Sequence, residues 1–254
     1  MSAGRSPFDR HGHESLEGSR LNQRGQPDAG PSTNTRAKAA ADKRRSILDA
    51  AVRVFARQGF YACRVADIAD EAGVAYGLVY HYFASKDEIL DTLFLERWNV
   101  MLDTIRHVDS QQISAREKLA AIASFIIDSY AHDPELMKVI IVEVTRAANS
   151  FGQTHLAQIR EAFTLISEIV TSAQAAGEFK TEITAEFAAI AFYGAIEQVL
   201  TGWIFGLLPS GSEHYEQAKR LVVETVCGGL DAGSGHAPSN GAPLPGRAPG
   251  NGPV

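Results

Sequence analysis

Apolar residues recur at helical spacing along most of the chain. The first apolar stripe lies on a helix that runs to about Gln58, where Gly59 ends it. Its members follow the i, i+1, i+4, i+7, i+8 pattern of one buried helix face: Ile47, Leu48, Ala51, Val54 and Phe55. This helix is expected to pack one side against the helices that follow it.

Two short helices joined by a turn are predicted next. The apolar face of the first comprises Val65, Ile68, Ala69 and Ala72. Gly73 follows at a position where a left-handed residue commonly ends a helix. In the second helix, Val79 and Phe83 lie four residues apart and can pack on the two preceding helices. The pattern predicts a helix-turn-helix, which places its second helix in the major groove of DNA.

The opposite side of this second helix is unusual for a solvated surface. It carries Gly77, Leu78 and His81, flanked by Tyr76, Tyr80 and Tyr82. In a major groove these residues make sense, because glycine permits close approach of the backbone and the polar groups reach phosphates or base edges. Ser85 and Glu88 then form a capping box for the next helix, whose first turn holds Lys86, within reach of a phosphate.

Four motifs in this stretch resemble the DNA-binding domain of the TetR/AcrR family of bacterial transcriptional regulators. They are DIA at Asp67–Ala69, AGV at Ala72–Val74, VYHYF at Val79–Phe83 and SKDEIL at Ser85–Leu90. The resemblance covers about residues 41–101. It implies a homodimer, a recognition helix that contacts an operator in double-stranded DNA, and an all-helical carboxy-terminal domain that binds a small molecule and thereby lowers DNA affinity.

Carried over position by position, the resemblance assigns DNA contacts to eight residues: Arg64, Tyr76, Gly77, Leu78, Tyr80, His81, Tyr82 and Lys86. One departure concerns the start of the first motif helix, where many members place a Ser or Thr cap. This chain has Cys63 and Arg64, and neither is a good cap. Either solvent caps the helix, or Arg64 is kept for a phosphate contact, which is the interpretation we favour.

The remaining chain is also helical by pattern. The expected helices span about residues 86–107, 115–131, 134–150, 154–176, 185–206 and 213–227. Asp133 and Pro134 begin one helix, Gly177 ends another, and Thr184 and Ser212 are candidate caps. With the three amino-terminal helices this gives nine. The fold class is all-α, with an amino-terminal three-helix DNA-binding domain and a carboxy-terminal ligand-binding and dimerisation domain at residues 102–230.

Small residues on the last two helices predict close packing between helices. They are Ala188, Ala191, Gly194, Ala195 and Gly202 on one, and Ala218 and Gly228 on the other. In the family these two helices pair with their symmetry mates as a four-helix bundle. Packing within a single chain is the alternative explanation for any one of these residues.

Polar and aromatic residues among the carboxy-terminal helices are candidates for an effector site. Each has a structural explanation when taken alone, but together they could line an apolar cavity with a few polar anchors. They are Trp98, Met101, Phe125, Tyr130, Glu143, Arg146, Asn149, Phe163, Tyr193, Glu197 and Trp203. The segments 143–149, 176–180 and 194–203 also resemble, more loosely, the fatty-acid-metabolism branch of the family, whose effectors are long-chain acyl-CoAs.

Both ends of the chain are expected to be disordered. Residues 1–40 and 231–254 are rich in Gly, Ser, Pro and Asn and lack apolar periodicity. The basic segment Arg36–Arg45 either tracks DNA beside the motif or is a plain flexible tail. His11 and His13 are close in sequence, but two histidines in a flexible segment make a weak metal site.

Composition and charge agree with a DNA-binding regulator. Residues 1–86 carry 13 Lys/Arg and 9 Asp/Glu, whereas residues 87–254 carry 11 and 21. A basic amino-terminal part suits contact with phosphate, although ordinary surface charge is the alternative. No apolar run approaches the ~20 residues that span a bilayer, and the amino terminus lacks the apolar core of a signal peptide. The cytoplasm is the expected location.

Other classes of function have weaker support. The chain lacks the GxSxG, CxxC and HExxH motifs and a Gly-rich phosphate loop, so we predict neither catalysis nor a cofactor or metal. Cys63 and Cys227 provide no disulfide framework. A thiol-based redox sensor at Cys63 and an architectural DNA-binding protein remain alternatives to a ligand-released repressor.

Overall fold

The computed structural model describes residues 33–143 and 153–231. Within these ranges all regular elements are helices, and the β-geometry is confined to one isolated bridge between Phe179 and Asp231. Contacts divide the chain into a unit of residues 1–42 and a unit of residues 43–254. The all-α class predicted from the sequence is confirmed.

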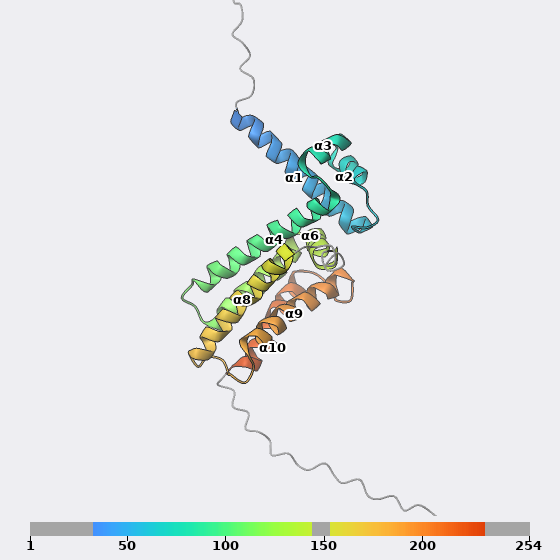
Figure 1. The fold of residues 1–254 in the computed structure, drawn as a ribbon. Helices are drawn as coiled ribbons and strands as arrows, with labels where there is room; N and C mark the ends of the chain where they lie inside the picture. Colours follow the sequence, from blue (N-terminus) through green and yellow to red (C-terminus); the bar gives the residue numbers. More distant parts are fainter. Residues whose placement is uncertain (1–32, 144–152, 232–254) are drawn as a thin grey trace, which may run out of the picture. The chain divides into compact units, whose positions relative to one another are not determined.

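The helix-turn-helix forms as its sequence predicts. α1 (Thr33–Gln58) is followed by α2 (Val65–Ala72) and α3 (Tyr76–Tyr82) (Figure 1). Between the last two, Gly73 has a left-handed conformation with φ +63°. Its backbone N–H donates hydrogen bonds to the carbonyl oxygens of Ala69 and Asp70 at the end of α2. The predicted core residues are buried: Ile47, Leu48, Phe55, Ile68, Val79 and Phe83. A glycine at this turn and apolar residues at helical spacing therefore suffice to fix the position of α3.

α1 begins earlier than the sequence pattern indicates. Residues 33–40, which were expected to be disordered, are helical, and the described side chains among them are exposed. Four alanines at positions 37 and 39–41 give this stretch a high helix propensity without an apolar face. Periodicity cannot detect such a helix, because it has no buried side.

Local capping sets the helix starts around the motif. Ser85 accepts a hydrogen bond from the backbone N–H of Glu88 (3.1 Å) at the start of α4 (Lys86–Asp109). At the start of α2 the Asp67 carboxylate accepts the backbone N–H of Arg64 at 2.7 Å, and the Arg64 side chain forms no cap. The absence of a Ser or Thr cap at this position is thus partly offset by Asp67.

A change of helix type occurs in the middle of the carboxy-terminal domain. α5 (Ala115–His132) is followed by α6 (Pro134–Lys138), which Asp133 caps, and then by a π-helix, η1 (Val139–Glu143). The sequence predicted one continuous helix over 134–150. The part beyond residue 143 lies outside the described residues, and the part before it is α-helical only as far as Lys138. π-Helical segments are uncommon and are often found at functional sites.

Three long helices complete the domain: α8 (Gln153–Ala175), α9 (Ala185–Ile204) and α10 (Ser212–Leu230). Figure 1 shows α4 and α8 side by side, with α9 and α10 forming a neighbouring pair. Thr184 caps α9 as predicted. Ser212 does not cap α10, because Gly211 occupies the N-cap position and Ser212 is the first helical residue.

Among the described helices, α9 is long and apolar enough to cross a membrane by length and composition alone. Its neighbours in the fold are α5, α8 and α10. Ala188, Ala189, Phe192 and Ile196 on α9 are buried within this arrangement. Packing thus explains the apolar residues on one side of α9, whereas Phe187 and Ile190 remain exposed.

Candidate DNA interface and effector cavity

One side of α3 exposes aromatic and small residues. Tyr76 and Tyr80 are 54% and 45% exposed, and their hydroxyls lie 3.2 Å apart. This hydrogen bond raises the pKa of Tyr80, with smaller contributions from burial and the Tyr76 charge. Gly77 is exposed, and a Cβ added there would meet no atom within 4 Å. Nothing within the protein therefore requires glycine at this position.

The other predicted DNA contacts vary in accessibility. His81 and Arg64 are exposed, whereas Leu78 and Tyr82 are half-buried. The His81 and Tyr82 rings meet edge to face with their centroids 5.1 Å apart. Because Tyr76, Gly77, Tyr80 and His81 recur at i, i+1, i+4 and i+5, they share one exposed face of α3.

Lys86 differs from the other candidates because its ammonium group already has protein partners. Nζ donates hydrogen bonds to the carbonyl oxygens of Phe60 (2.5 Å) and Cys63 (2.9 Å). It also lies 4.5 Å from the centroid of the Phe60 ring. Lys86 therefore joins the start of α4 to the loop between α1 and α2. These partners lie 26 and 23 residues away, so the local sequence does not indicate them.

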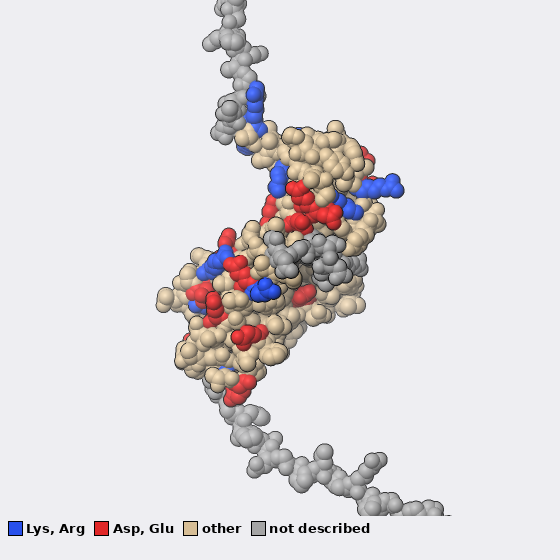
Figure 2. All heavy atoms as spheres, in the orientation of Figure 1, with Lys and Arg blue, Asp and Glu red and all other residues tan. Residues whose placement is uncertain are grey.

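Four basic residues in the carboxy-terminal part of α1 are paired with acids. Arg44 and Arg45 contact Glu96 at 3.2 and 2.9 Å. Arg53 and Arg57 contact Glu71 at 2.6 and 3.0 Å, and these hydrogen bonds lower the pKa of Glu71. In Figure 2 basic and acidic side chains are interleaved over the visible face. The surplus of basic residues in the amino-terminal sequence thus does not translate into an unpaired basic surface on this part of α1.

A small cavity lies between α4, α5, α6, η1 and α9. Its volume is about 20 Å³, which is close to the space of a single water molecule. The lining includes four of the residues predicted for an effector site: Trp98, Met101, Tyr193 and Glu197. Phe163 packs against Tyr193 with the ring centroids 5.5 Å apart, and Phe125 lies 4.8 Å from the guanidinium of Arg97.

The other predicted effector-site residues are not brought to this cavity. Tyr130 and Trp203 stack on each other with centroids 5.4 Å apart, and Tyr215 completes a separate aromatic cluster. The Trp203 indole donates to the carbonyl of Pro209 at 2.9 Å. The side chain of Glu143 and all of Arg146 and Asn149 lie outside the described residues.

Several lining residues were missed by sequence reasoning, namely Arg97, Met137, Ile140 and Ile141. A signal for Arg97 was present, since it lies three residues after Phe94 and four before Met101, on the core-facing stripe of α4. Burial lowers the pKa of Arg97 and raises the pKa values of Glu197 and Tyr193. The cavity therefore combines an apolar wall with three polar groups in a poorly solvated position.

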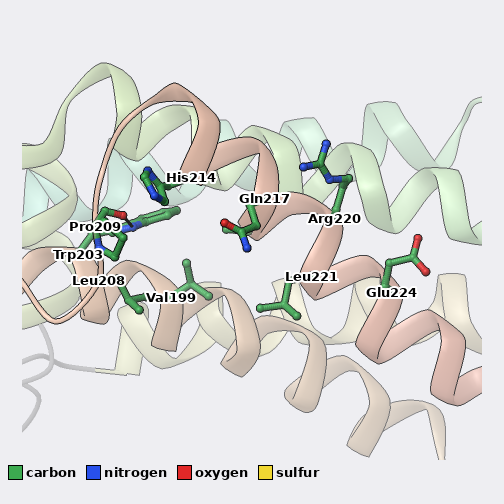
Figure 3. Close-up of a pocket in the computed structure, with 10 residues that line it drawn as sticks. Val199, Trp203, Leu208, Pro209, His214, Gln217, Arg220, Leu221 and Glu224 are labelled. Carbon is green, nitrogen blue, oxygen red and sulfur yellow. Dashed lines mark hydrogen bonds between the residues drawn. The ribbon is translucent and has the colours of Figure 1, made fainter.

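A wider apolar groove of about 730 Å³ follows the surface of α9 and α10 (Figure 3). Val199, Leu208 and Leu221 provide apolar surface, and Arg220 and Glu224 project from α10. Gly202, one of the small residues predicted to permit helix pairing, has an internal role. A Cβ at Gly202 would lie 2.6 Å from Leu208 Cδ1, so the glycine makes room for the turn after α9.

The cysteines are buried. Cys63 is 3% exposed, and its thiol donates to the carbonyl of Phe60 at 3.3 Å. Burial raises the pKa of Cys227 to about 11. Buried positions of this kind are typical of structural cysteines. In residues 33–143 and 153–231, no three His, Cys, Asp or Glu side chains are grouped to hold a metal ion.

Comparison with known proteins assigns the class. Residues 47–93 match the model described as bacterial regulatory proteins of the tetR family, and residues 94–208 match the carboxy-terminal region of YsiA-like proteins. The chain belongs to the tetR family of bacterial regulatory proteins, which are DNA-binding transcriptional regulators. Among its relatives is the fatty acid metabolism regulator protein of Bacillus subtilis, 30% identical over 162 residues, which cover 64% of this chain and 84% of the relative.

A second relative and two solved structures are also similar to this chain. The transcriptional repressor KstR2 of Rhodococcus jostii is 24% identical over 79% of this chain and 96% of the relative. The structure of the fatty acid degradation regulator FadR from Bacillus halodurans has a TM-score of 0.66 and 26% identity, covering 74% of this chain and 95% of that one. That of Bacillus subtilis FadR in complex with stearoyl-CoA has a TM-score of 0.63 and 26% identity, covering 73% and 98%.

Proposed function

We propose that this protein is a repressor that binds an operator as a homodimer through α3 and is released from DNA by a long-chain acyl-CoA. The observation that carries the proposal is the course of α4. This helix begins with Lys86 beside the DNA-binding motif and continues to Arg97, Trp98 and Met101, which line the cavity. A ligand that enlarges the cavity would therefore act on the helix that supports α3.

The DNA contacts in this proposal lie on the exposed face of α3. Tyr76, Tyr80 and His81 provide hydroxyl and imidazole groups for phosphates or base edges, and Gly77 lets the backbone approach the groove. Leu78 offers an apolar contact for a thymine methyl group, and Tyr82 and Arg64 flank the face. In this proposal Lys86 does not contact a phosphate. It positions the motif through its hydrogen bonds to the loop between α1 and α2.

The dimer in this proposal uses α9 and α10. Phe187 and Ile190 on α9 and Leu221 on α10 are 71%, 55% and 56% exposed. Large apolar side chains gathered on neighbouring helices are typical of a protein interface. A two-fold axis through such an interface would place two copies of α3 roughly 34 Å apart, or at a multiple of this spacing, to match successive turns of DNA.

Two observations support a long-chain acyl-CoA as the effector, namely the ligand of a related structure and the lining of the cavity. The Bacillus subtilis FadR structure contains stearoyl-CoA, and the cavity here has an apolar wall of Ile126, Met137, Ile140 and Ile141. Its volume of about 20 Å³ is far below the roughly 300 Å³ or more of small-molecule sites, so an acyl chain must displace part of this wall.

A direct contact joins this wall of the cavity to the DNA-binding motif. Lys138, at the end of α6, donates a hydrogen bond from Nζ to the carbonyl of Ala56 in the last turn of α1 at 2.8 Å. Its neighbour Met137 lines the cavity. An acyl chain that moves α6 and η1 would thus break this contact, and bound effector would weaken DNA binding. Such a regulator acts in the cytoplasm and needs no catalytic group.

The proposal is tested by selection from a randomised DNA duplex pool, performed with and without stearoyl-CoA. We expect a palindromic site that is enriched without the ligand and lost with it, whereas free CoA at the same concentration leaves enrichment unchanged. Retention of DNA without sequence preference would contradict the proposal and favour an architectural protein. A peroxide response that persists in Cys63→Ser would argue against the thiol-sensor alternative.

A further inference from the structure

The polar residues that line the cavity come from two helices. Arg97 lies on α4, and Tyr193 and Glu197 lie four residues apart on one face of α9. The apolar residues of the lining come from all five elements that surround the cavity. An effector that enters this space therefore meets a few polar groups within an apolar surface.

Among the residues that the structure describes, these three groups form no hydrogen bond or ion pair, although the guanidinium of Arg97 stacks on the Phe125 ring. This is unusual, because half-buried charges in proteins are normally paired. The cation and the carboxyl group line the same small cavity without forming a salt bridge with each other.

The groups are nevertheless close enough to influence one another. Burial raises the pKa of Tyr193, the Glu197 charge raises it further, and the Arg97 cation opposes this. Burial also raises the pKa of Glu197. Arg97 supplies several N–H donors and no acceptor, and the Tyr193 hydroxyl can supply one more donor. The cavity thus offers donors from two helices in a poorly solvated site.

We propose that Arg97 and Tyr193 bind the carbonyl oxygen of the effector's acyl group, in the cavity that Glu197 also lines. This inference rests on the proposed function, since it assumes that an acyl compound enters the cavity. It adds that the site recognises the acyl head and not only the length of the alkyl chain. A thioester carbonyl and a free carboxylate share this chemistry, so both a long-chain acyl-CoA and a long-chain fatty acid satisfy it.

The sharpest test compares ligands that differ by this oxygen alone. Stearoyl-CoA and its thioether analogue S-octadecyl-CoA have the same alkyl length and the same CoA group, but the thioether lacks the carbonyl. We expect the full-length protein to bind stearoyl-CoA at least about tenfold more tightly in calorimetry, as for a hydrogen bond to a charged donor. Stearate and stearyl alcohol provide the corresponding pair without CoA, and a preference for stearate would identify the free acid as the source.

Substitutions of Arg97 test whether this residue causes the preference for stearoyl-CoA over S-octadecyl-CoA. Arg97→Met should reduce the ratio of the two affinities to near one, and Arg97→Lys should restore part of it. Arg106→Met removes a cation from the same helix outside the cavity and should keep the wild-type ratio. If Arg97→Met does not fold, the comparison of ligands on the wild-type protein still decides the proposal.

Failure of the carbonyl-site proposal can be distinguished from failure of the acyl-effector proposal. Equal binding of stearoyl-CoA and S-octadecyl-CoA by the wild-type protein, or an unchanged ratio in folded Arg97→Met, would overturn the assignment of the carbonyl site and leave an acyl effector in place. Absence of binding by all four ligands would overturn the acyl effector itself, and the carbonyl site with it.

Discussion

Two glycines of the helix-turn-helix have different physical roles. Gly73 has φ +63°, a conformation that side chains with a Cβ rarely adopt, so the fold requires it. Gly77 is helical, exposed and free of neighbours that a methyl group would meet. A glycine that its described neighbours do not require, on the face proposed to enter the groove, supports the proposed close approach to DNA.

Gly77→Ala should therefore separate stability from DNA binding. Alanine is favoured over glycine in a helix by about 1 kcal/mol, so the free energy of unfolding should stay the same or rise. Operator affinity should fall about tenfold or more, because the added methyl group would hold the backbone away from the bases. Gly73→Ala is the matched control, with stability lowered by roughly 1–2 kcal/mol. Unchanged affinity in Gly77→Ala would exclude close approach at this position.

Lys86 provides a second prediction at this scale. Lys86→Met removes the two hydrogen bonds to the carbonyls of Phe60 and Cys63. We expect chemical denaturation to show a loss of roughly 1–3 kcal/mol, with an unchanged dependence of operator affinity on salt. A fall in the salt slope by about one unit would instead show that Lys86 contacts a phosphate, as its sequence position suggested.

At the scale of elements, α4 and the α6–η1 segment each join the cavity to the DNA-binding motif. α4 does so along its own length, and α6 does so through the contact of Lys138 with the end of α1. An ammonium group at a helix carboxy terminus is favoured by the helix dipole. The two connections let a change in cavity volume reach α1 and α3 by separate paths.

Lys138→Met should weaken this communication. Without the contact to Ala56, α1 loses one restraint, so operator affinity in the absence of ligand should fall severalfold. Stearoyl-CoA should then reduce the operator affinity of the variant by a smaller factor than it reduces that of the wild type. Lys118→Met is the matched control, because Lys118 donates at 2.7 Å to the carbonyl of Asp109, the last residue of α4, away from the motif. Equal responses of wild type and Lys138→Met in fluorescence anisotropy titrations would contradict the role of this contact.

The sequence predicted elements better than it predicted contacts. Gly59, Gly73, Ser85, Asp133 and Thr184 mark helix ends through interactions with residues only a few positions away, and the structure confirms each of them. The helical stretch 33–40 and η1 were missed, the first because it has no apolar face and the second because a π-turn leaves the apolar content of its segment unchanged.

The candidate cavity was predicted only in part for a different reason. Trp98, Met101, Tyr193 and Glu197 were identified by residue type, but Tyr130 and Trp203 have the same character and pack elsewhere. Which aromatic residues share a space depends on helix packing, which residue type does not encode. The roles of Lys86 and Lys138 depend on backbone carbonyls 26 and 82 residues away.

For the whole molecule, function depends on two copies of the chain. The apolar groove along α9 and α10 and the exposed Phe187, Ile190 and Leu221 define the surface proposed to bury itself in the dimer. A single α3 contacts only a few base pairs. Two copies related by a two-fold axis would read both halves of a palindromic site and give it affinity and specificity.

Leu221→Glu should separate the two copies. A carboxylate at the centre of an apolar interface is costly to desolvate, so we expect sedimentation analysis to show a monomer whose thermal stability is close to that of the wild type. Operator binding should fall by at least a hundredfold. Ala176→Glu adds the same single negative charge at an exposed position in the turn after α8, outside the groove, and is the control. A Leu221→Glu dimer would show that another surface mediates assembly.

The most direct test of the account is the thermodynamic coupling between operator and stearoyl-CoA. Operator affinity is measured with and without saturating stearoyl-CoA, and stearoyl-CoA affinity is measured with and without the operator. We expect the ligand to weaken DNA binding and DNA to weaken ligand binding by the same factor, because the two sites share one equilibrium. Operator affinity unchanged by bound stearoyl-CoA would contradict release of the repressor by its effector.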